Sequence, residues 1–280
     1  MPIHTRSTFE SFKRLKTALA SGERTFYTRY GDGDVYLLRG EGIYNHKYDP
    51  QLTQELTDSI LVEDPGFMKA LCVNYELDPG MEAGLFTWYP DNDEMAAFLS
   101  EKFSPEATWE FEHHFTLPYY AIFRPEAFID LFETHIRSKK KLFVGGVKKE
   151  VAEQLFGPID EYVQTPLRNA FGKFDEWVPE VLRKLDKVEL VLPTAGAAGK
   201  ILNKRLWEMG YEGNSLDIGA LIDWVDGRRT RKWIKLKGHK INDVLVPQHR
   251  RTSLSFRAEY AYREAYYKVR RVWKGLRGEL

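Results

Sequence analysis

The stretch Val188-Glu-Leu-Val-Leu-Pro-Thr-Ala-Gly-Ala-Ala-Gly-Lys200 decides the fold class of this chain. It begins with an apolar, strand-like run, passes through a turn of small residues, and continues as a predicted helix to Met209. Residues 214–218 then return to a strand pattern. A strand followed by a crossover helix and a second strand is the unit from which parallel sheets are built.

The same alternation extends towards the N-terminus. Apolar or β-branched runs predict strands over 25–29, 67–75, 119–123, 141–146 and around Val163. Periodic patterns predict helices over 7–21, 35–39, 50–62, 93–102, 125–137, 148–156 and 174–186. A last long helix, rich in Tyr, Phe and Arg, is predicted over 256–276. The sequence therefore predicts an α/β domain with a mostly parallel sheet flanked by helices, and a helical C-terminal appendage.

Composition narrows the class of protein. The chain has 280 residues, of which 43% are hydrophobic and 29% charged, as in soluble globular proteins. Its one cysteine, Cys72, excludes a disulfide within the chain. No apolar run approaches the ~18 residues of a membrane-spanning helix, and the N-terminus lacks the apolar centre of a signal peptide. We therefore expect a cytoplasmic protein.

The net charge of zero conceals an asymmetry. Residues 49–112 hold fifteen acids and two bases, whereas residues 228–251 hold nine bases and one acid. The basic segment suits a phosphate-bearing ligand. Alternatively, it pairs with the acidic segment or forms a solvated face. Trp224 and Trp233 flank its first bases, and aromatic rings interleaved with bases are typical of stacking on a sugar or a nucleobase.

The run Arg29-Tyr-Gly-Asp-Gly-Asp34 follows a predicted strand. Two glycines permit a tight turn and close approach of a ligand. Two neighbouring carboxylates, Asp32 and Asp34, repel each other unless a cation lies between them, and Mg²⁺ or Mn²⁺ binds carboxylates together with phosphate oxygens. Arg29 would add a bidentate phosphate contact. The alternative is a plain Gly/Asp turn that caps the next helix.

Two further segments end predicted strands. The small residues of Pro193–Gly199, before Lys200, leave backbone N–H groups free to meet a phosphate; tight packing of helix on strand is the alternative. Asp217 and Asp223 follow the last strand, where ligands of open α/β sheets bind. These carboxylates could bind a sugar hydroxyl or a metal, or act as a general base. The alternative is that they only cap a helix or form a turn. The pair His113-His114 lacks metal-ligand spacing, and we expect it to be structural.

Three segments in the same order resemble the GT-D type glycosyltransferases. Arg29-Tyr-Gly-Asp-Gly-Asp34 resembles that family's R-[FY]-G-D-G-[ED] signature. Thr165-Pro-Leu-Arg-Asn-Ala-Phe171 is similar to its P-x-x-N-A-F segment. The stretch from Pro193 to Gly219, with Lys200 and Asp217-Ile-Gly219, looks like its strand–turn–helix–strand end.

The resemblance implies a Rossmann-like fold, a nucleotide-sugar donor, commonly a UDP-sugar, and a divalent cation, Mn²⁺ or Mg²⁺. By position, Asp32 and Asp34 inherit the metal. The donor-binding residues that it implies are Arg29, Tyr30, Gly31, Gly33, Asn169, Thr194, Lys200 and Asp217.

We therefore expect residues 1–225 to form a GT-D-like domain and residues 226–280 a basic, aromatic extension packed on it. The predicted activity is metal-dependent sugar transfer, with Asp34 or Asp223 accepting the acceptor's proton. Three arginines are expected to bind a phosphate-bearing acceptor, such as a lipid diphosphate, a glycan or a nucleic acid: Arg228, Arg229 and Arg231.

The sequence departs from the family pattern at two positions. Asp34 stands where Glu is usual, and Ala220 stands where His usually follows D-I-G. These departures support an alternative function, a catalytically inactive nucleotide-sugar-binding module in a glycan- or nucleic-acid-modification complex.

Overall fold

The computed structural model describes residues 3–43, 46–73, 92–103, 110–229 and 231–247, together with positions 265 and 269. An eight-stranded sheet forms its centre, and each pairing between its strands is parallel. The strands are β1 (His4–Thr5), β2 (Phe26–Tyr30), β3 (Phe67–Leu71), β4 (Glu110–His113), β5 (Lys141–Gly145), β6 (Glu161–Gln164), β7 (Leu190–Thr194) and β8 (Asn214–Leu216). The predicted α/β class with a parallel sheet is confirmed.

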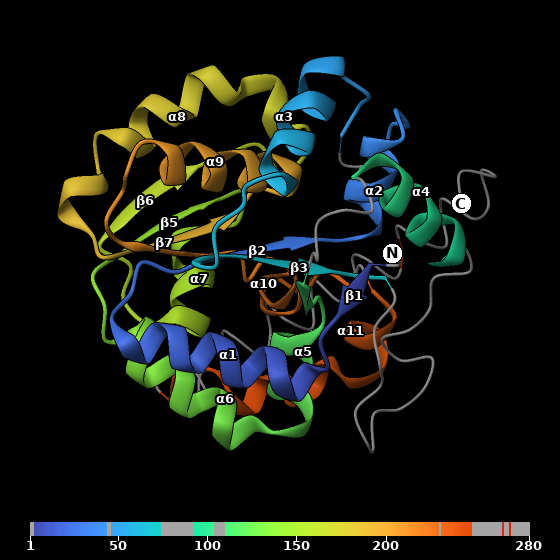
Figure 1. Ribbon diagram of the computed structural model, residues 1–280. Coiled ribbons are helices and arrows are strands. Elements are labelled where there is room, and N and C mark those ends of the chain that lie inside the picture. The colour runs from blue at the N-terminus through green and yellow to red at the C-terminus, as the bar shows by residue number, and fades with distance from the viewer. Residues whose placement is uncertain are drawn as a thin grey trace.

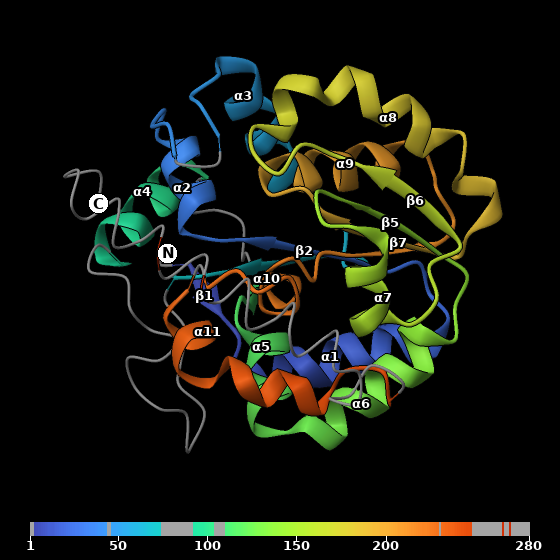
Figure 2. The same cartoon turned by 180° about the vertical axis from the view of Figure 1, so that it is seen from behind.

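Helices cover both faces of this sheet (Figures 1 and 2). The helices on one face, with their continuation towards the β1 edge, are α2 (Asp32–Leu38), α3 (Pro50–Ile60), α4 (Asn92–Lys102), α8 (Phe174–Leu182) and α9 (Ala197–Glu208). Those on the other are α1 (Thr8–Ser21), α5 (Thr116–Phe123), α6 (Pro125–Phe132), α7 (Lys149–Phe156), α10 (Ala220–Val225) and α11 (Lys232–Lys237). Short helical turns complete the set: η1 (Glu133–Arg137), η2 (Ala170–Lys173), η3 (Leu185–Lys187) and η4 (Gly238–Asp243).

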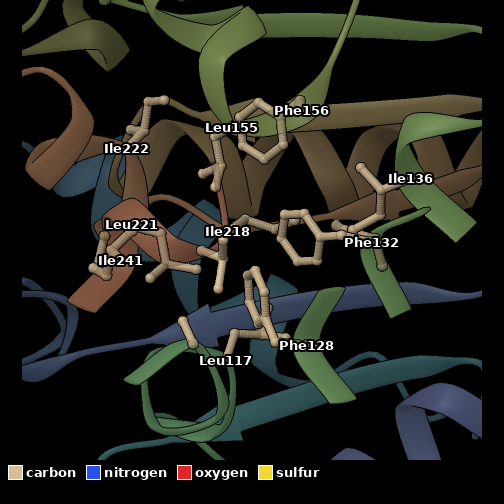
Figure 3. Packing of buried hydrophobic residues seen from close by; sticks show 14 of the residues in the cluster. Leu117, Phe128, Phe132, Ile136, Leu155, Phe156, Ile218, Leu221, Ile222 and Ile241 are labelled. Atoms are coloured by element: carbon tan, nitrogen blue, oxygen red, sulfur yellow. The ribbon is translucent and has the colours of Figure 1, made fainter. Parts of the chain in front are cut away.

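The side-chain alternation of the strands divides the core into two layers. Phe26 packs into the layer under α3 and α9, and its neighbour Tyr27 packs into the layer over α1 and α6. Figure 3 shows this second layer, where aromatic rings of α6 meet aliphatic side chains from α7 and the segment after β8. A sheet with both faces buried explains why its strands read as nearly continuous apolar runs.

The strand order is β1-β4-β3-β2-β8-β7-β5-β6. The chain leaves β2 towards β3 on one side and returns to β8 from β7 on the other. The order therefore reverses between β2 and β8, and ligands of open α/β sheets bind at the carboxyl ends of the strands at such a point. The residues after β2, β7 and β8 occupy that position.

A buried polar contact fixes α9 across this reversal point. The Asn203 amide of α9 donates to Thr28 Oγ1 of β2 over 2.9 Å, and accepts from Ser215 Oγ of β8 over 2.6 Å. All three residues are fully buried. Because a buried amide without partners is costly, this network sets the register of α9 on the two strands.

The strand predicted over Tyr119–Phe123 is wrong, since these residues belong to α5. The strand in this part of the chain is β4, Glu110–His113, which comes shortly before α5. A short apolar run does not distinguish a buried strand from a helix buried on nearly all sides, and almost every side chain of α5 is buried. The helix predicted over 256–276 lies outside the described residues, apart from positions 265 and 269.

Residues 231–247 pack against the domain. Trp233, Ile234 and Ile241 join the same core layer as α10. The expectation that Trp224 and Trp233 stack on a ligand is wrong, because only 4% and 2% of their surfaces are exposed. Trp224 Nε1 donates to Asn242 Oδ1 instead. In the part of the chain that the structure describes, no helix is both long and apolar enough to cross a bilayer.

Candidate functional site

The turn after β2 is the first turn of α2. Gly31 caps this helix, and its N–H donates to Asp34 Oδ2 over 2.8 Å. This bond turns the Asp34 carboxylate inward, where it is 8% exposed. Asp32 lies one position into the helix and is half-buried. The two aspartates therefore have different surroundings, although the sequence makes them look equivalent.

Lys200 of α9 brings three distant segments together. Its Nζ lies 3.2 Å from Asp217 Oδ2, after β8, and 3.6 Å from Asp34 Oδ2. It also donates to the Gly196 carbonyl over 3.1 Å. Three of the residues that the resemblance assigned to the donor or the metal, Lys200, Asp34 and Asp217, therefore lie together in the structure.

Burial and charge act in opposite directions on this cluster. Burial raises the pKa of Asp34, and the ammonium of Lys200 and the Gly31 N–H oppose that shift. Burial alone would lower the pKa of Lys200, but the carboxylates of Asp217 and Asp34 outweigh it and raise this pKa. Lys200 therefore stays charged and stabilises two carboxylates that would otherwise be buried without a counterion.

Arg29, at the end of β2, is buried to 4% exposure. Its Nε donates to the His114 carbonyl over 3.1 Å, and its Nη2 lies 3.1 Å from His114 Nε2. The described residues offer no carboxylate within ion-pair distance of this guanidinium. Because only neutral groups hold this buried guanidinium, its positive charge is not offset and favours the binding of an anion.

Two histidines that the sequence analysis did not assign to the site line it. Burial, then the charges of Arg29, Arg231 and Lys200, lower the pKa of His114 well below its ordinary value. Burial and the charge of Lys200 lower the pKa of His46 to about 4. Both rings are therefore neutral. His46 Nε2 lies against the turn before α9, where a Cβ on Gly196 would come within 2.7 Å of it, and Gly196 has a φ of +61°.

Comparison with known proteins identifies the family of this chain. A family model described as "Glycosyltransferase GT-D fold" matches residues 27–244. The chain belongs to the GT-D family. It is thus an enzyme of the glycosyltransferase type, and the resemblance to this family is confirmed.

Solved structures share the fold at low sequence identity. One described as "A New Glycosyltransferase (DUF1792) from Streptococcus sanguinis" is 23% identical, with a TM-score of 0.59 over 80% of this chain and 83% of that one. A selenomethionine-substituted structure of domain of unknown function 1792 is 21% identical, with a TM-score of 0.59 over 80% of each chain. At these identities the likeness establishes the fold. No curated protein sequence matches the chain.

Other predicted donor residues of this GT-D chain lie elsewhere around the sheet edge. The Tyr30 ring is fully buried in the core, and its hydroxyl pairs with Ser59 Oγ at 2.9 Å. Thr194 donates to the Val144 carbonyl across to β5. Asn169 is exposed in a left-handed conformation with φ of 51°. It follows β6, the edge strand four places from β2, and makes no hydrogen bond or ion pair with Lys200 or Asp34 in the described structure.

The predicted base Asp223 is engaged by the basic segment. Arg228 lies 2.9 Å from Asp223 Oδ1 and Arg231 lies 3.0 Å from Asp223 Oδ2. Arg228 also pairs with Asp226 at 2.9 Å. Arg228 and Arg231 thus pair with aspartates beside them in the chain. Arg229 lies over the Trp224 ring, 5.8 Å from its centroid.

The carboxylates of the turn after β2 could supply part of the ligand set of a divalent cation. Asp32 offers a carboxylate with no hydrogen bond among the described residues, and one Asp34 oxygen is not used by Gly31 or Lys200. Within the described residues no group of three His, Cys, Asp or Glu side chains could hold a metal. A cation here would take its remaining ligands from phosphate oxygens and water, as Mg²⁺ commonly does.

The central role of Lys200 leads to a first prediction. Lys200→Met should lower the free energy of unfolding by about 3 kcal/mol at neutral pH, because it strands two buried carboxylates. Burial already raises the pKa of Asp34, and removal of the ammonium raises it further. Asp34 is then protonated in the folded state as the pH falls, so the deficit should shrink between about pH 8 and pH 5.

Urea unfolding at both pH values measures this effect. Lys204→Met is the matched control, since Lys204 lies on the same helix and pairs with Glu55 and Glu208 nearer the surface. That variant should lose less than about 1 kcal/mol. A Lys200→Met deficit that is as large at pH 5 as at pH 8 would contradict the assigned role.

Proposed function

We propose that this GT-D enzyme transfers a sugar from a UDP-sugar to an acceptor, with the donor diphosphate bound at the reversal point between β2 and β8. The observation that carries the proposal is Arg29, a buried guanidinium without a carboxylate partner in the described structure. A buried charge of this kind is costly unless an anion joins it. A diphosphate supplies that anion and presents paired oxygens that match a guanidinium.

The departing nucleoside diphosphate needs groups that stabilise negative charge. Sugar transfer breaks the bond between the anomeric carbon and the diphosphate oxygen, and negative charge develops on the departing nucleoside diphosphate. Arg29 and Lys200 are fixed positive groups that would stabilise this charge without reorganisation. Asp32 and Asp34 would hold a Mn²⁺ or Mg²⁺ ion, which would supply Lewis-acid stabilisation of the same oxygens.

The acceptor hydroxyl must lose a proton as it attacks the sugar. Asp223 is the candidate base from the α10 side, and two arginines occupy its oxygens. We propose that an acceptor phosphate draws Arg228 and Arg231 away, which frees the carboxylate to accept the proton. Asp34, the other candidate, lies on the donor side and has a raised pKa, which suits a proton acceptor.

The family assignment argues against the inactive binding module, the alternative that Ala220 favoured. Ala220 begins α10 and is buried in the core, so it provides no titratable group where the family pattern has His. Hydrolysis of UDP-sugars without acceptor separates the two candidates, because a pure binding module would bind UDP and release no sugar.

If Arg29 binds the donor diphosphate, a substitution of Arg29 should weaken UDP binding without a matching loss of protein stability. Arg29→Met should weaken UDP binding at least about 30-fold, because ~2 kcal/mol or more is lost when one partner of a buried charge pair is removed. The melting temperature should change little, since the variant also removes a buried charge that the protein itself does not neutralise. Calorimetric titration with UDP and thermal melting of the same preparation test this. Wild-type protein that does not bind UDP or any nucleoside diphosphate would refute the proposed function.

The metal assignment predicts that Asp32→Asn lowers turnover at least about 100-fold, as expected when a Lewis acid worth several kcal/mol is lost. The fold should be unaffected, because Asp32 makes no hydrogen bond among the described residues. Turnover is measured against Mn²⁺ and Mg²⁺ concentration, with EDTA-treated wild type and Asp58→Asn of α3 as controls. Full activity in the EDTA-treated enzyme, or in Asp32→Asn, would contradict the metal role.

The acceptor assignment predicts that changing Arg228, Arg229 and Arg231 together to Ala raises the acceptor KM, with a weaker salt dependence. Donor hydrolysis without acceptor should change little. The melting temperature should also fall, because Asp223 and Asp226 lose their partners. A fall in melting temperature with an unchanged acceptor KM would make these arginines structural. An equal loss of hydrolysis and transfer would place them at the donor instead.

A further inference from the structure

We propose that His114 is a positioning residue that aims the Arg29 guanidinium at the donor phosphate without neutralising its charge. The inference rests on the proposed function and concerns a residue that lies outside the motifs of the sequence. His114 follows β4, and its backbone N–H donates to the Leu71 carbonyl of β3 over 3.1 Å. Its main chain is therefore fixed to the sheet beside the strand that carries Arg29.

The hydrogen bonds define which edge of the guanidinium is available. The Nε–H and one Nη2–H of an arginine point along the same edge of the planar group. In Arg29 this edge faces His114, with Nε on the carbonyl oxygen and Nη2 at the ring Nε2, each at 3.1 Å. The opposite edge, with Nη1 and the second Nη2–H, has no hydrogen-bond partner among the described residues. That edge is the one left for paired phosphate oxygens.

The same contact fixes the protonation of the ring. A guanidinium can only donate, so His114 Nε2 must accept and carries no proton. The neutral ring then bears its proton on Nδ1. Burial, Arg29, Arg231 and Lys200 all act against protonation of His114, so an imidazolium is excluded at neutral pH. A carboxylate in place of the imidazole would hold Arg29 as well, but it would cancel the charge that the phosphate needs.

The His114 ring is packed on two sides. A Cβ on Gly31 would lie 3.3 Å from His114 Cε1 and 3.6 Å from Nε2, so the motif turn packs closely against the ring. Phe115 meets the ring edge-on, with centroids 4.9 Å apart. His114 Nδ1 is buried with no partner in the described structure. Because such a donor costs free energy, stability alone does not account for this histidine.

Three substitutions at His114 separate positioning from packing. His114→Gln retains an acceptor near the Nε2 position and should bind UDP within about 3-fold of wild type. His114→Leu removes it and should weaken UDP binding about 10- to 100-fold, the value of one charge-assisted hydrogen bond. His114→Glu should weaken binding at least as much, while its melting temperature stays at or above that of His114→Leu, because the new carboxylate pairs with Arg29.

A double-mutant cycle tests whether His114 acts through Arg29. In the Arg29→Met background, His114→Leu should have little further effect on the UDP dissociation constant. His113→Gln is the matched control: it changes the neighbouring buried histidine, whose Nδ1 accepts from the Phe115 N–H. It should affect melting temperature more than UDP affinity. Equal UDP affinities in His114→Gln and His114→Leu, wild-type affinity in His114→Glu, or additive effects in the cycle would each overturn the proposal.

Nitrogen NMR of the imidazole supplies a readout that does not depend on the donor. It should show His114 neutral, with Nδ1 protonated and Nε2 unprotonated, from about pH 8 to about pH 5. A proton on Nε2 would overturn the proposal whether or not UDP binds. If wild type binds no UDP but this tautomer is present and is lost in Arg29→Met, the proposed function fails and the contact between His114 and Arg29 stands.

Discussion

The site depends on one buried ammonium. Lys200 joins α9 to the first turn of α2 and to the segment after β8, with Nζ 3.2 Å from Asp217 and 3.6 Å from Asp34. These segments meet because the strand order reverses between β2 and β8, which places their carboxyl ends side by side. The strand order of the sheet brings Asp34 and Asp217 close together, and the Lys200 ammonium allows both carboxylates to be buried there.

Much of this arrangement could be predicted from the sequence. The alternation of apolar strands and periodic helices predicted the parallel sheet. The expectation that Lys200 and Asn169 both join the motif aspartates is met for Lys200, which lies 3.6 Å from Asp34, whereas Asn169 follows the edge strand β6. The strand of Glu110–His113 was missed, and with it the position of His114. This strand carries the charged residues Glu110 and Glu112, and Arg14 and Arg6 neutralise buried Glu112 from α1 and the segment before it. Because the neutralising arginines are distant in the sequence, no local pattern predicts that this charged segment forms a buried strand.

The carboxylate at position 34 is the N3 side chain of a capping box. An aspartate reaches back to the N–H of Gly31 within its own helical turn, and this bond, together with Lys200, holds its carboxylate inward. Asp32 remains half-buried at the same turn. The two carboxylates of the motif are therefore unequal: one belongs to the charged interior of the site, and the other is available to whatever binds there.

The charges around the reversal point identify the group that lacks an anion. Lys200 has two carboxylates, Asp34 and Asp217, and Arg231 has Asp223. Among the described residues, Arg29 has only the carbonyl and the neutral ring of His114. Arg29 is 4% exposed, whereas the Arg231 side chain is 40% exposed, so leaving the Arg29 charge without an anion costs free energy that a ligand can recover. An anionic ligand therefore gains most by binding where β2 ends, and the neutrality of His114 preserves that gain.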